Sequence, residues 1–107
     1  MSTLTNEQPA QATDVSINSD ELAVELLDGR TIIVTLVWYP RLVHGTSKER
    51  RHWRLIARGE GIHWPDLDED ISVQNLLTGR PSGESQRSLK QWLESRSQKK
   101  ARKAKEK

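Results

Sequence analysis

The dipeptide Asp28-Gly29, which separates two apolar segments, constrains the fold of this chain more than any other feature. Asp-Gly in this setting is typical of a β-hairpin, since both central positions of a type I′ turn need positive φ. Before the turn, Leu22–Leu26 alternates apolar and polar residues with the period of two that a half-buried strand requires. After the turn, Thr31–Trp38 is rich in β-branched residues and apolar on both faces, so we expect it to lie centrally in a sheet, covered on each side.

Proline, glycine and capping residues mark where the neighbouring elements begin and end. Val15 and Ile17 alternate in the same way, which adds a short edge strand before the hairpin. Pro40 ends the second hairpin strand, because proline cannot donate to a strand ladder. Thr46-Ser47-Lys48-Glu49 has the form of a capping box and predicts a helix over 47–58, which Gly59 ends in the left-handed conformation.

The next segment predicts a strand, an acidic loop and a short helix. Gly61–Trp64 is short enough for a third strand, which Pro65 closes. If Ile62 points inward, the alternation of strand side chains places His63 on the outer face. The carboxylates of 66–70 are then expected in a loop before a short helix capped by Ser72, where the helix dipole favours negative charge.

The C-terminal part predicts one more helix and a basic tail. A helix is expected from about Glu84, and a narrow apolar stripe formed by Leu89, Trp92 and Leu93 docks it on the body. From Ser95 to Lys107 there are seven basic residues and one Glu, a net charge of +6, which leaves −4 for residues 1–94. This end is expected to be either a solvated helix extension or a disordered tail.

Composition limits the chain to one small domain. Its 107 residues are too few for two separate cores, and only 34% are hydrophobic. Residues 1–13 are polar and are expected to form a disordered leader. We therefore expect a single α+β domain over 14–94, with a small antiparallel sheet of three to four strands, a β-hairpin and two to three packed helices. A basic tail over 95–107 follows it.

The same composition excludes several classes of protein. Cysteine is absent, which excludes a disulfide framework, a thiolate nucleophile and a thiolate metal site. The first residues lack the basic and apolar parts of a signal peptide, and no apolar run is long enough to span a membrane. We expect a cytoplasmic protein that has no membrane segment, uses no cofactor and is not an enzyme.

The alternating carboxylates Asp66, Asp68 and Asp70 copy the first half of a calcium-binding loop. The second half does not follow the pattern, because Ile71 stands where the loop needs glycine and Leu77 where it needs a bidentate Glu. We interpret these carboxylates as charge before a helix and in a solvated loop.

His63 lies beside these carboxylates, and an imidazole there could act as a general base or a metal ligand. The other imidazoles, His44 and His52, are not at a helix spacing of four from one another, and no nucleophile motif such as Gly-x-Ser-x-Gly occurs. We therefore interpret His63 as a half-exposed strand residue.

Five segments, taken in order, resemble a known family. They are Asp28-Gly29-Arg30, Trp38-Tyr39-Pro40-Arg41-Leu42, Trp53-Arg54-Leu55-Ile56, the block from Gly59 to Ser72, and Gly79-Arg80-Pro81-Ser82. Together they resemble the bacterial family catalogued as domain of unknown function 2442, over about Asp14 to Leu93. The resemblance implies a small α+β domain with no established reaction. It also implies a protein partner encoded nearby, since such genes often stand beside another small family in pairs described as toxin–antitoxin modules.

The leading interpretation is a non-enzymatic protein-interaction domain, with an antitoxin-like role in a two-gene module as the resemblance implies. Rings, arginine and carboxylates concentrate near 38–42 and 61–70 beyond what a fold needs, so the candidate partner surface is Trp38, Tyr39, Arg41, His63, Trp64, Asp66 and Asp68.

The alternative is a nucleic-acid-binding accessory protein, because basic side chains that neutralise phosphates release counterions. No recognition helix of a helix-turn-helix is evident, the predicted helix must also bury Trp53, and the domain is net acidic. The candidate contacts are Arg51, Arg54, Arg58, Lys99, Lys100, Arg102 and Lys103.

Overall fold

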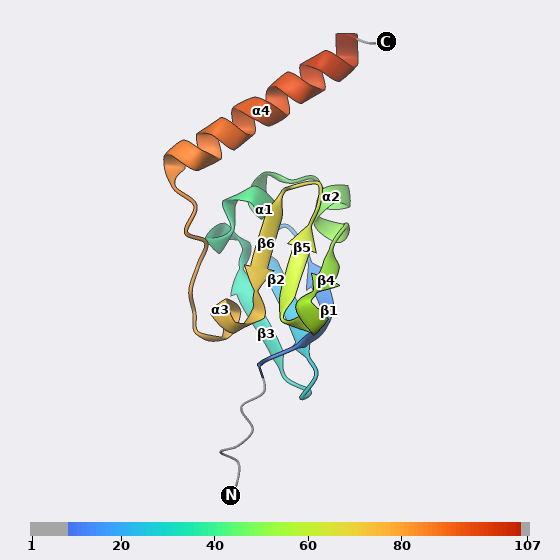
Figure 1. The fold of residues 1–107 in the computed structure, drawn as a ribbon, viewed down its shortest axis with the longest axis vertical. Coiled ribbons are helices and arrows are strands. Elements are labelled where there is room, and N and C mark those ends of the chain that lie inside the picture. Colours follow the sequence, from blue (N-terminus) through green and yellow to red (C-terminus); the bar gives the residue numbers. More distant parts are fainter. Residues whose placement is uncertain (1–8, 106–107) are drawn as a thin grey trace, which may run out of the picture.

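Two three-stranded antiparallel sheets, one ordered β1-β2-β3 and the other β4-β5-β6, form the body of the protein (Figure 1). The computed structural model describes residues 9–105, and side chains as far as Lys99. The strands are β1 (Ala12–Ile17), β2 (Glu21–Leu26), β3 (Thr31–Thr35), β4 (Arg54–Ile56), β5 (Gly61–Trp64) and β6 (Glu69–Ser72). The helices are α1 (Pro40–His44), α2 (Ser47–Arg51), α3 (Val73–Leu77) and α4 (Gln86–Lys105), with the 3₁₀ turns η2 (Leu36–Trp38) and η3 (Ala57–Gly59). The predicted α+β class is confirmed, with two sheets in place of one.

The predicted hairpin forms at Asp28-Gly29, with a different turn. The amide of Leu26 donates to the carbonyl of Arg30 at 2.8 Å, and the amide of Gly29 donates to the carbonyl of Leu26 at 3.0 Å. Gly29 has a φ of 95°, whereas Asp28 does not have positive φ. The connection is therefore a three-residue turn that ends in a left-handed glycine, not the predicted type I′ turn.

The second hairpin strand, β3, is an edge strand, and the prediction that it lies centrally is wrong. β2 lies between β1 and β3, and the side chain of Ile33 is 58% exposed. The strand also ends earlier than predicted, because the hydroxyl of Thr35 accepts the amide of Val37 and starts η2. β-branched residues favour any strand position and do not distinguish an edge from a centre.

The predicted helix over 47–58 is correct only as far as Arg51. The capping box is present: the Thr46 hydroxyl accepts the Glu49 amide at 3.1 Å, and the Glu49 carboxylate accepts the Thr46 amide at 2.9 Å. After α2 the chain extends into β4, which pairs with β5 and sets Leu55 opposite Ile62. The pairing of β4 with β5 thus overrides the helical pattern of the residues after Arg51.

The acidic segment is a hairpin turn and a strand, not a loop leading directly into a helix. β5 and β6 pair with His63 opposite Asp70, so Glu69 and Asp70 belong to β6. Asp68 adopts a φ of 52° in the turn between them. Ser72 caps α3 as predicted, because its hydroxyl accepts the Asn75 amide at 3.2 Å.

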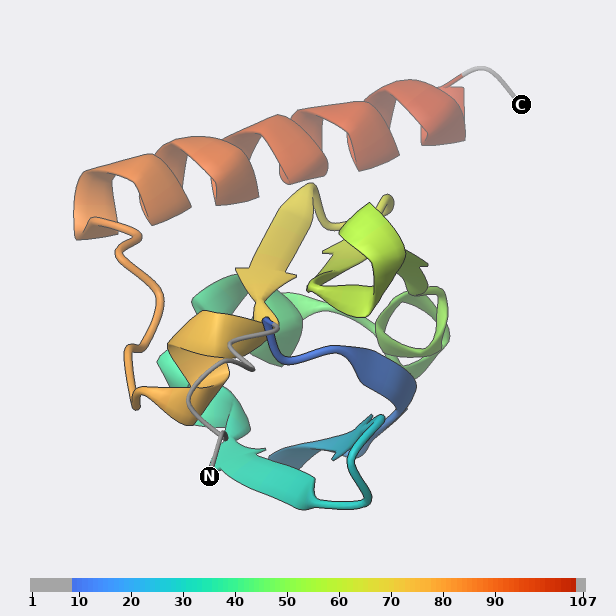
Figure 2. The same cartoon turned by 60° about the horizontal axis from the view of Figure 1, so that its bottom comes forward.

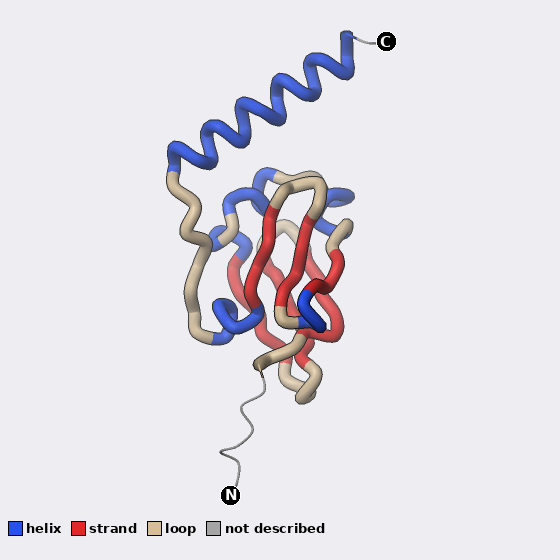
Figure 3. The backbone as a smooth tube through the Cα atoms, viewed as in Figure 1, coloured by secondary structure: helices blue, strands red, loops and turns tan. Residues whose placement is uncertain are grey.

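The two sheets enclose one apolar core, and they appear as separate layers in Figure 2. Figure 3 shows strands of both layers in red, with short blue helices at their margins. The core contains Leu22 and Val24 from one sheet and Ile62 and Trp64 from the other, all 0% exposed. The indole N–H of Trp64 donates to the Arg50 carbonyl at 2.9 Å, which satisfies the ring's polar atom and joins β5 to α2.

The N-terminal end differs from the predicted boundary, and the C-terminal end takes one of the two forms that were predicted for it. Ala12 and Thr13 belong to β1 and not to the leader, because Ala12 pairs with Leu26 and is buried; residues 1–8 lie outside the described part. The last helix begins near the predicted Glu84, and α4 continues without interruption through Lys105. The backbone of most of the predicted basic tail is therefore a helix extension.

Gly59 offers a direct test of this arrangement. Its φ is 88°, and a Cβ there would lie 2.7 Å from the Ala12 carbonyl oxygen. Gly79 has a φ of 73° with nothing within 4 Å of such a Cβ. We expect Gly79→Ala to lose about 1–2 kcal/mol of unfolding free energy from left-handed strain alone, and Gly59→Ala to lose at least about 1 kcal/mol more. Urea unfolding followed by Trp fluorescence measures both, and equal losses would contradict the close contact between β1 and η3.

Candidate functional site

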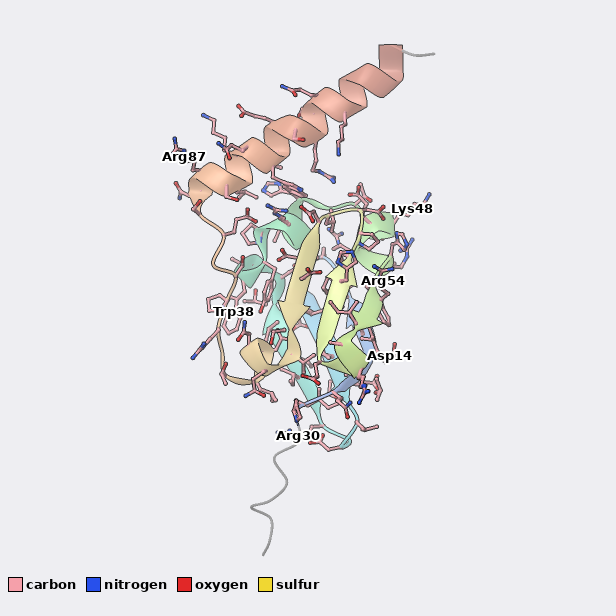
Figure 4. All side chains as sticks on the ribbon, in the orientation of Figure 1. Asp14, Arg30, Trp38, Lys48, Arg54 and Arg87 are labelled. Atoms are coloured by element: carbon pink, nitrogen blue, oxygen red, sulfur yellow. The ribbon has the colours of Figure 1, made fainter. Side chains whose placement is uncertain are left out.

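Two rings of the predicted partner surface lie in the core. Trp64 is 0% exposed and Tyr39 is 4% exposed. The Tyr39 hydroxyl donates to the Arg80 carbonyl at 3.3 Å, which joins the start of α1 to the linker before α4. These rings pack inside the molecule and leave no ring face for a partner. Trp38 is only partly buried and points outward on the β3 side of the body (Figure 4).

Arg41 holds the linker and the β5–β6 turn together. Its Nε and Nη2 atoms donate to the two carboxylate oxygens of Glu84 at 2.7 and 2.9 Å. Its Nη1 donates to the backbone carbonyl of Asp68 at 2.9 Å, and the Asp68 carboxylate lies at 3.5 Å. The hydrogen bonds from Arg41 lower the pKa of Glu84 and, in return, raise that of Arg41. This bidentate pair is largely shielded from water, which makes it stronger than an exposed ion pair.

Two guanidinium groups lie over the ring of Trp92 in α4. The Arg41 guanidinium carbon is 5.0 Å from the Trp92 ring centroid, and that of Arg96 is 4.7 Å from it. Arg96 also donates to the Glu49 carboxylate at 2.9 Å and to the Asp66 carbonyl at 3.4 Å. Arg41, Glu49 and the 66–68 turn thus form a receiving surface for α4, which we call the α4 seat.

The three alternating carboxylates face three different partners. Asp66 bonds to Nδ1 of His52 at 2.6 Å, and Asp68 lies near Arg41. Asp70 pairs across the sheet with Nδ1 of His63, whose ring lies on the outer face as predicted. Among the described residues no group of three or more acidic or imidazole side chains could hold a metal ion.

Glu69 is a titratable residue that the sequence analysis did not single out. It lines a cleft of about 150 Å³ between β6 and the linker, together with Tyr39, Asn75 and Ser82. Partial burial, opposed by Arg41 and reinforced by nearby carboxylates, raises its pKa to about 7. Alternation from the buried Ile71 could have placed Glu69 on the inner face, had β6 been recognised as a strand.

The predicted nucleic-acid contacts are spread over several elements, and one of them, Arg54, lies directly opposite His63 in the second sheet. Arg51, Arg54 and Arg58 are exposed on α2, β4 and η3. Lys99 is exposed on α4. Lys100, Arg102 and Lys103 follow it in the same helix, where the structure describes the backbone alone.

Residues 12–82 match a family described as "Protein of unknown function (DUF2442)". The chain belongs to this family. The match covers both sheets and ends before α4, and it confirms the resemblance seen in the sequence. No curated protein matches the chain.

Two solved structures show the same fold. A protein of unknown function from Rhodospirillum rubrum is 22% identical, with a TM-score of 0.64 over 72% of this chain and 95% of that one. The uncharacterised protein CV0863 from Chromobacterium violaceum is 21% identical, with a TM-score of 0.60 over 68% of this chain and 69% of that one. In the described part of the chain, no helix combines the length and apolar character needed to cross a membrane.

Replacing Trp92 by Ala should release α4 from its seat. The change removes two cation–π contacts of about 0.5–1 kcal/mol each as well as ring burial, so amide protection over 90–96 should fall by about tenfold or more. Alanine is a better helix former than tryptophan, so lost protection would report undocking and not lower propensity. Hydrogen exchange measures the effect, with the exposed Gln91→Ala as control. Unchanged protection in Trp92→Ala would contradict the seat.

Glu69 should make stability depend on pH. Its pKa rises from 4.5 to about 7 on folding, so the folded state binds the extra proton between these values and stability falls as pH rises through them. Glu69→Gln should therefore be more stable than the wild type at pH 8, by about 1–3 kcal/mol. The two proteins should differ little at pH 4. Urea unfolding at both pH values measures this, and the exposed Glu60→Gln is the control. A gain that is equal at both pH values would refute the assignment.

Proposed function

We propose that this protein is a non-enzymatic protein-interaction domain that binds its partner through an apolar ridge. The ridge consists of four exposed apolar side chains, Leu27, Ile33, Val37 and Val43, together with the partly exposed Trp38. Val37 is 73% exposed, and this observation carries the proposal. Contiguous exposed apolar surface marks interaction sites in soluble proteins, and we propose that these side chains, which all fall between residues 27 and 43, form such a surface.

The surroundings of the ridge indicate what kind of partner it fits. Residues 9–29 contain five carboxylates and no Lys or Arg: Asp14, Asp20, Glu21, Glu25 and Asp28. Ile33 of β3 pairs with Ala23 of β2 on the outer face of the first sheet. The pairs on either side of it each contain a glutamate of β2, Glu21 or Glu25, opposite a threonine of β3. The complementary surface is therefore apolar at its centre and basic at its rim.

The polar cluster near 61–70 supports a binding role over an enzymatic one. Its Arg, His and carboxylate side chains pair with each other, and its Arg41 and turn residues seat α4. We further propose that the partner is encoded nearby, that the pair acts as a two-gene module with this chain as the antitoxin-like member, and that both work in the cytoplasm. The family resemblance supports this finer proposal.

A ridge variant tests the proposal. Ile33→Gln with Val37→Gln removes apolar surface without changing charge, and both positions are exposed, so folding should be retained. We expect the partner's Kd to rise by about tenfold or more, since exposed apolar anchors dominate such interfaces. The partner is identified by affinity purification from the native cell and by co-expression with the neighbouring gene product. Titration with the purified partner then gives Kd.

The matched control is Ser95→Gln with Ser97→Gln, which alters two exposed polar residues of α4 that are not part of the ridge. It should bind like the wild type. Equal binding by the ridge variant, or equal loss in both variants, would refute the proposed surface.

A further inference from the structure

A basic strip runs along the side of the body away from Trp38. It consists of Lys48 and Arg51 of α2, Arg54 of β4 and Arg58 of η3, and we call it the basic edge. All four side chains are exposed, and Lys48 and Arg54 point outward on the side opposite Trp38 in Figure 4. Within the described residues, no carboxylate lies within salt-bridge distance of these four. Their charge is therefore available to a partner.

The fold itself spreads these side chains in a row. β4 is the outer strand of its sheet, and Leu55 faces inward opposite Ile62, so alternation turns Arg54 outward. Arg58 sits in a turn with a φ of 58°, directly after that strand. Glu49 is the acidic residue of α2, and it is already paired with Arg96.

The sequence of α4 adds further basic residues beyond the body. The ion pair between Arg96 and Glu49 fixes the helix over α2, and residues 97–105 continue past it for about 13 Å, at 1.5 Å per residue. Figures 1 and 2 both place this end of α4 toward the side that carries α2 and β4, extending away from the body. The sequence of 97–105 contains no acidic residue and five basic ones: Lys99, Lys100, Arg102, Lys103 and Lys105. We call this part of the helix the basic arm.

We propose that the basic edge and the basic arm together bind the phosphate backbone of double-stranded nucleic acid without sequence preference. Two positive elements held at a fixed angle can contact a rigid, regularly spaced row of phosphates along a duplex. Single strands are usually held by stacking on large exposed rings, whereas the indole that lies between Arg51 and Arg54 in sequence, Trp53, packs partly against the core. The site is separate from the apolar ridge, so this proposal and the proposed function succeed or fail independently.

A salt titration with matched variants tests the proposal. The probe is a fluorescent 20-base-pair DNA of arbitrary sequence, and anisotropy gives Kd between 50 and 200 mM NaCl. Arg51→Gln, Arg54→Gln and Arg58→Gln, combined, should reduce the slope of log K against log salt by about 2–3, because each lost phosphate contact removes about 0.9. A chain ending at Gln98 should also bind more weakly, since it lacks the arm.

The control is a triple variant with the same change in net charge: Arg30→Gln, Arg80→Gln and Arg87→Gln. These side chains are exposed, and none lies on the basic edge. The proposal predicts a slope within about 1 of the wild type for this variant. Absence of binding at 50 mM NaCl, or equal losses in both triple variants, would overturn it.

A second copy of the chain is the competing occupant, because the strands of the first sheet carry carboxylates and no basic residue. Sedimentation velocity at 50 mM NaCl distinguishes this case. A dimer that is lost in the basic-edge variant and that duplex DNA does not disperse would overturn the proposal. A monomer that binds the duplex would support it.

Discussion

The guanidinium of Arg41 is the point on which the arrangement of this molecule depends. It forms two hydrogen bonds with Glu84, holds the β5–β6 turn through the Asp68 carbonyl, and lies over the Trp92 ring. One side chain on a five-residue helix thereby joins the two-sheet body to the linker and to α4. Arginine suits this role better than lysine, because its planar donors bind a carboxylate in bidentate fashion while its face stacks on a ring.

This role gives the rings and carboxylates near 61–70 an architectural cause. Trp64 fills the core and is bonded to Arg50, while Asp66, Asp68 and Asp70 each pair with a different side chain. The family match covers the two sheets and stops before α4. The α4 seat therefore belongs to the family domain, whereas α4 itself lies outside the match. Binding is accordingly expected on the surfaces that these pairs leave free, the apolar ridge and the basic edge.

Local signals in the sequence were reliable where short-range chemistry decides the structure. The position of the Asp28-Gly29 hairpin, though not its turn type, the Thr46–Glu49 capping box and the Ser72 cap each depend on residues a few positions apart. The failures occurred where pairing between strands decides the structure: β4 pairs with β5 across a turn, and the acidic segment becomes β6 because β5 offers it an edge. For the candidate site, composition located the Arg, Trp and carboxylate residues but not their contacts. Arg41 and Glu84 are 43 positions apart, and no periodicity links them.

The central claim is that α4 is held against the body at a fixed angle, which occupies the seat and directs the basic arm over α2. Because the chain contains no Cys, spin labels can be attached to cysteines introduced at the exposed positions Ser47 and Gln98. Double electron–electron resonance then measures the distribution of distances between them. The account predicts one narrow distribution that broadens in Trp92→Ala. A broad distribution in the otherwise unaltered chain, typical of a helix on a flexible tether, would contradict it.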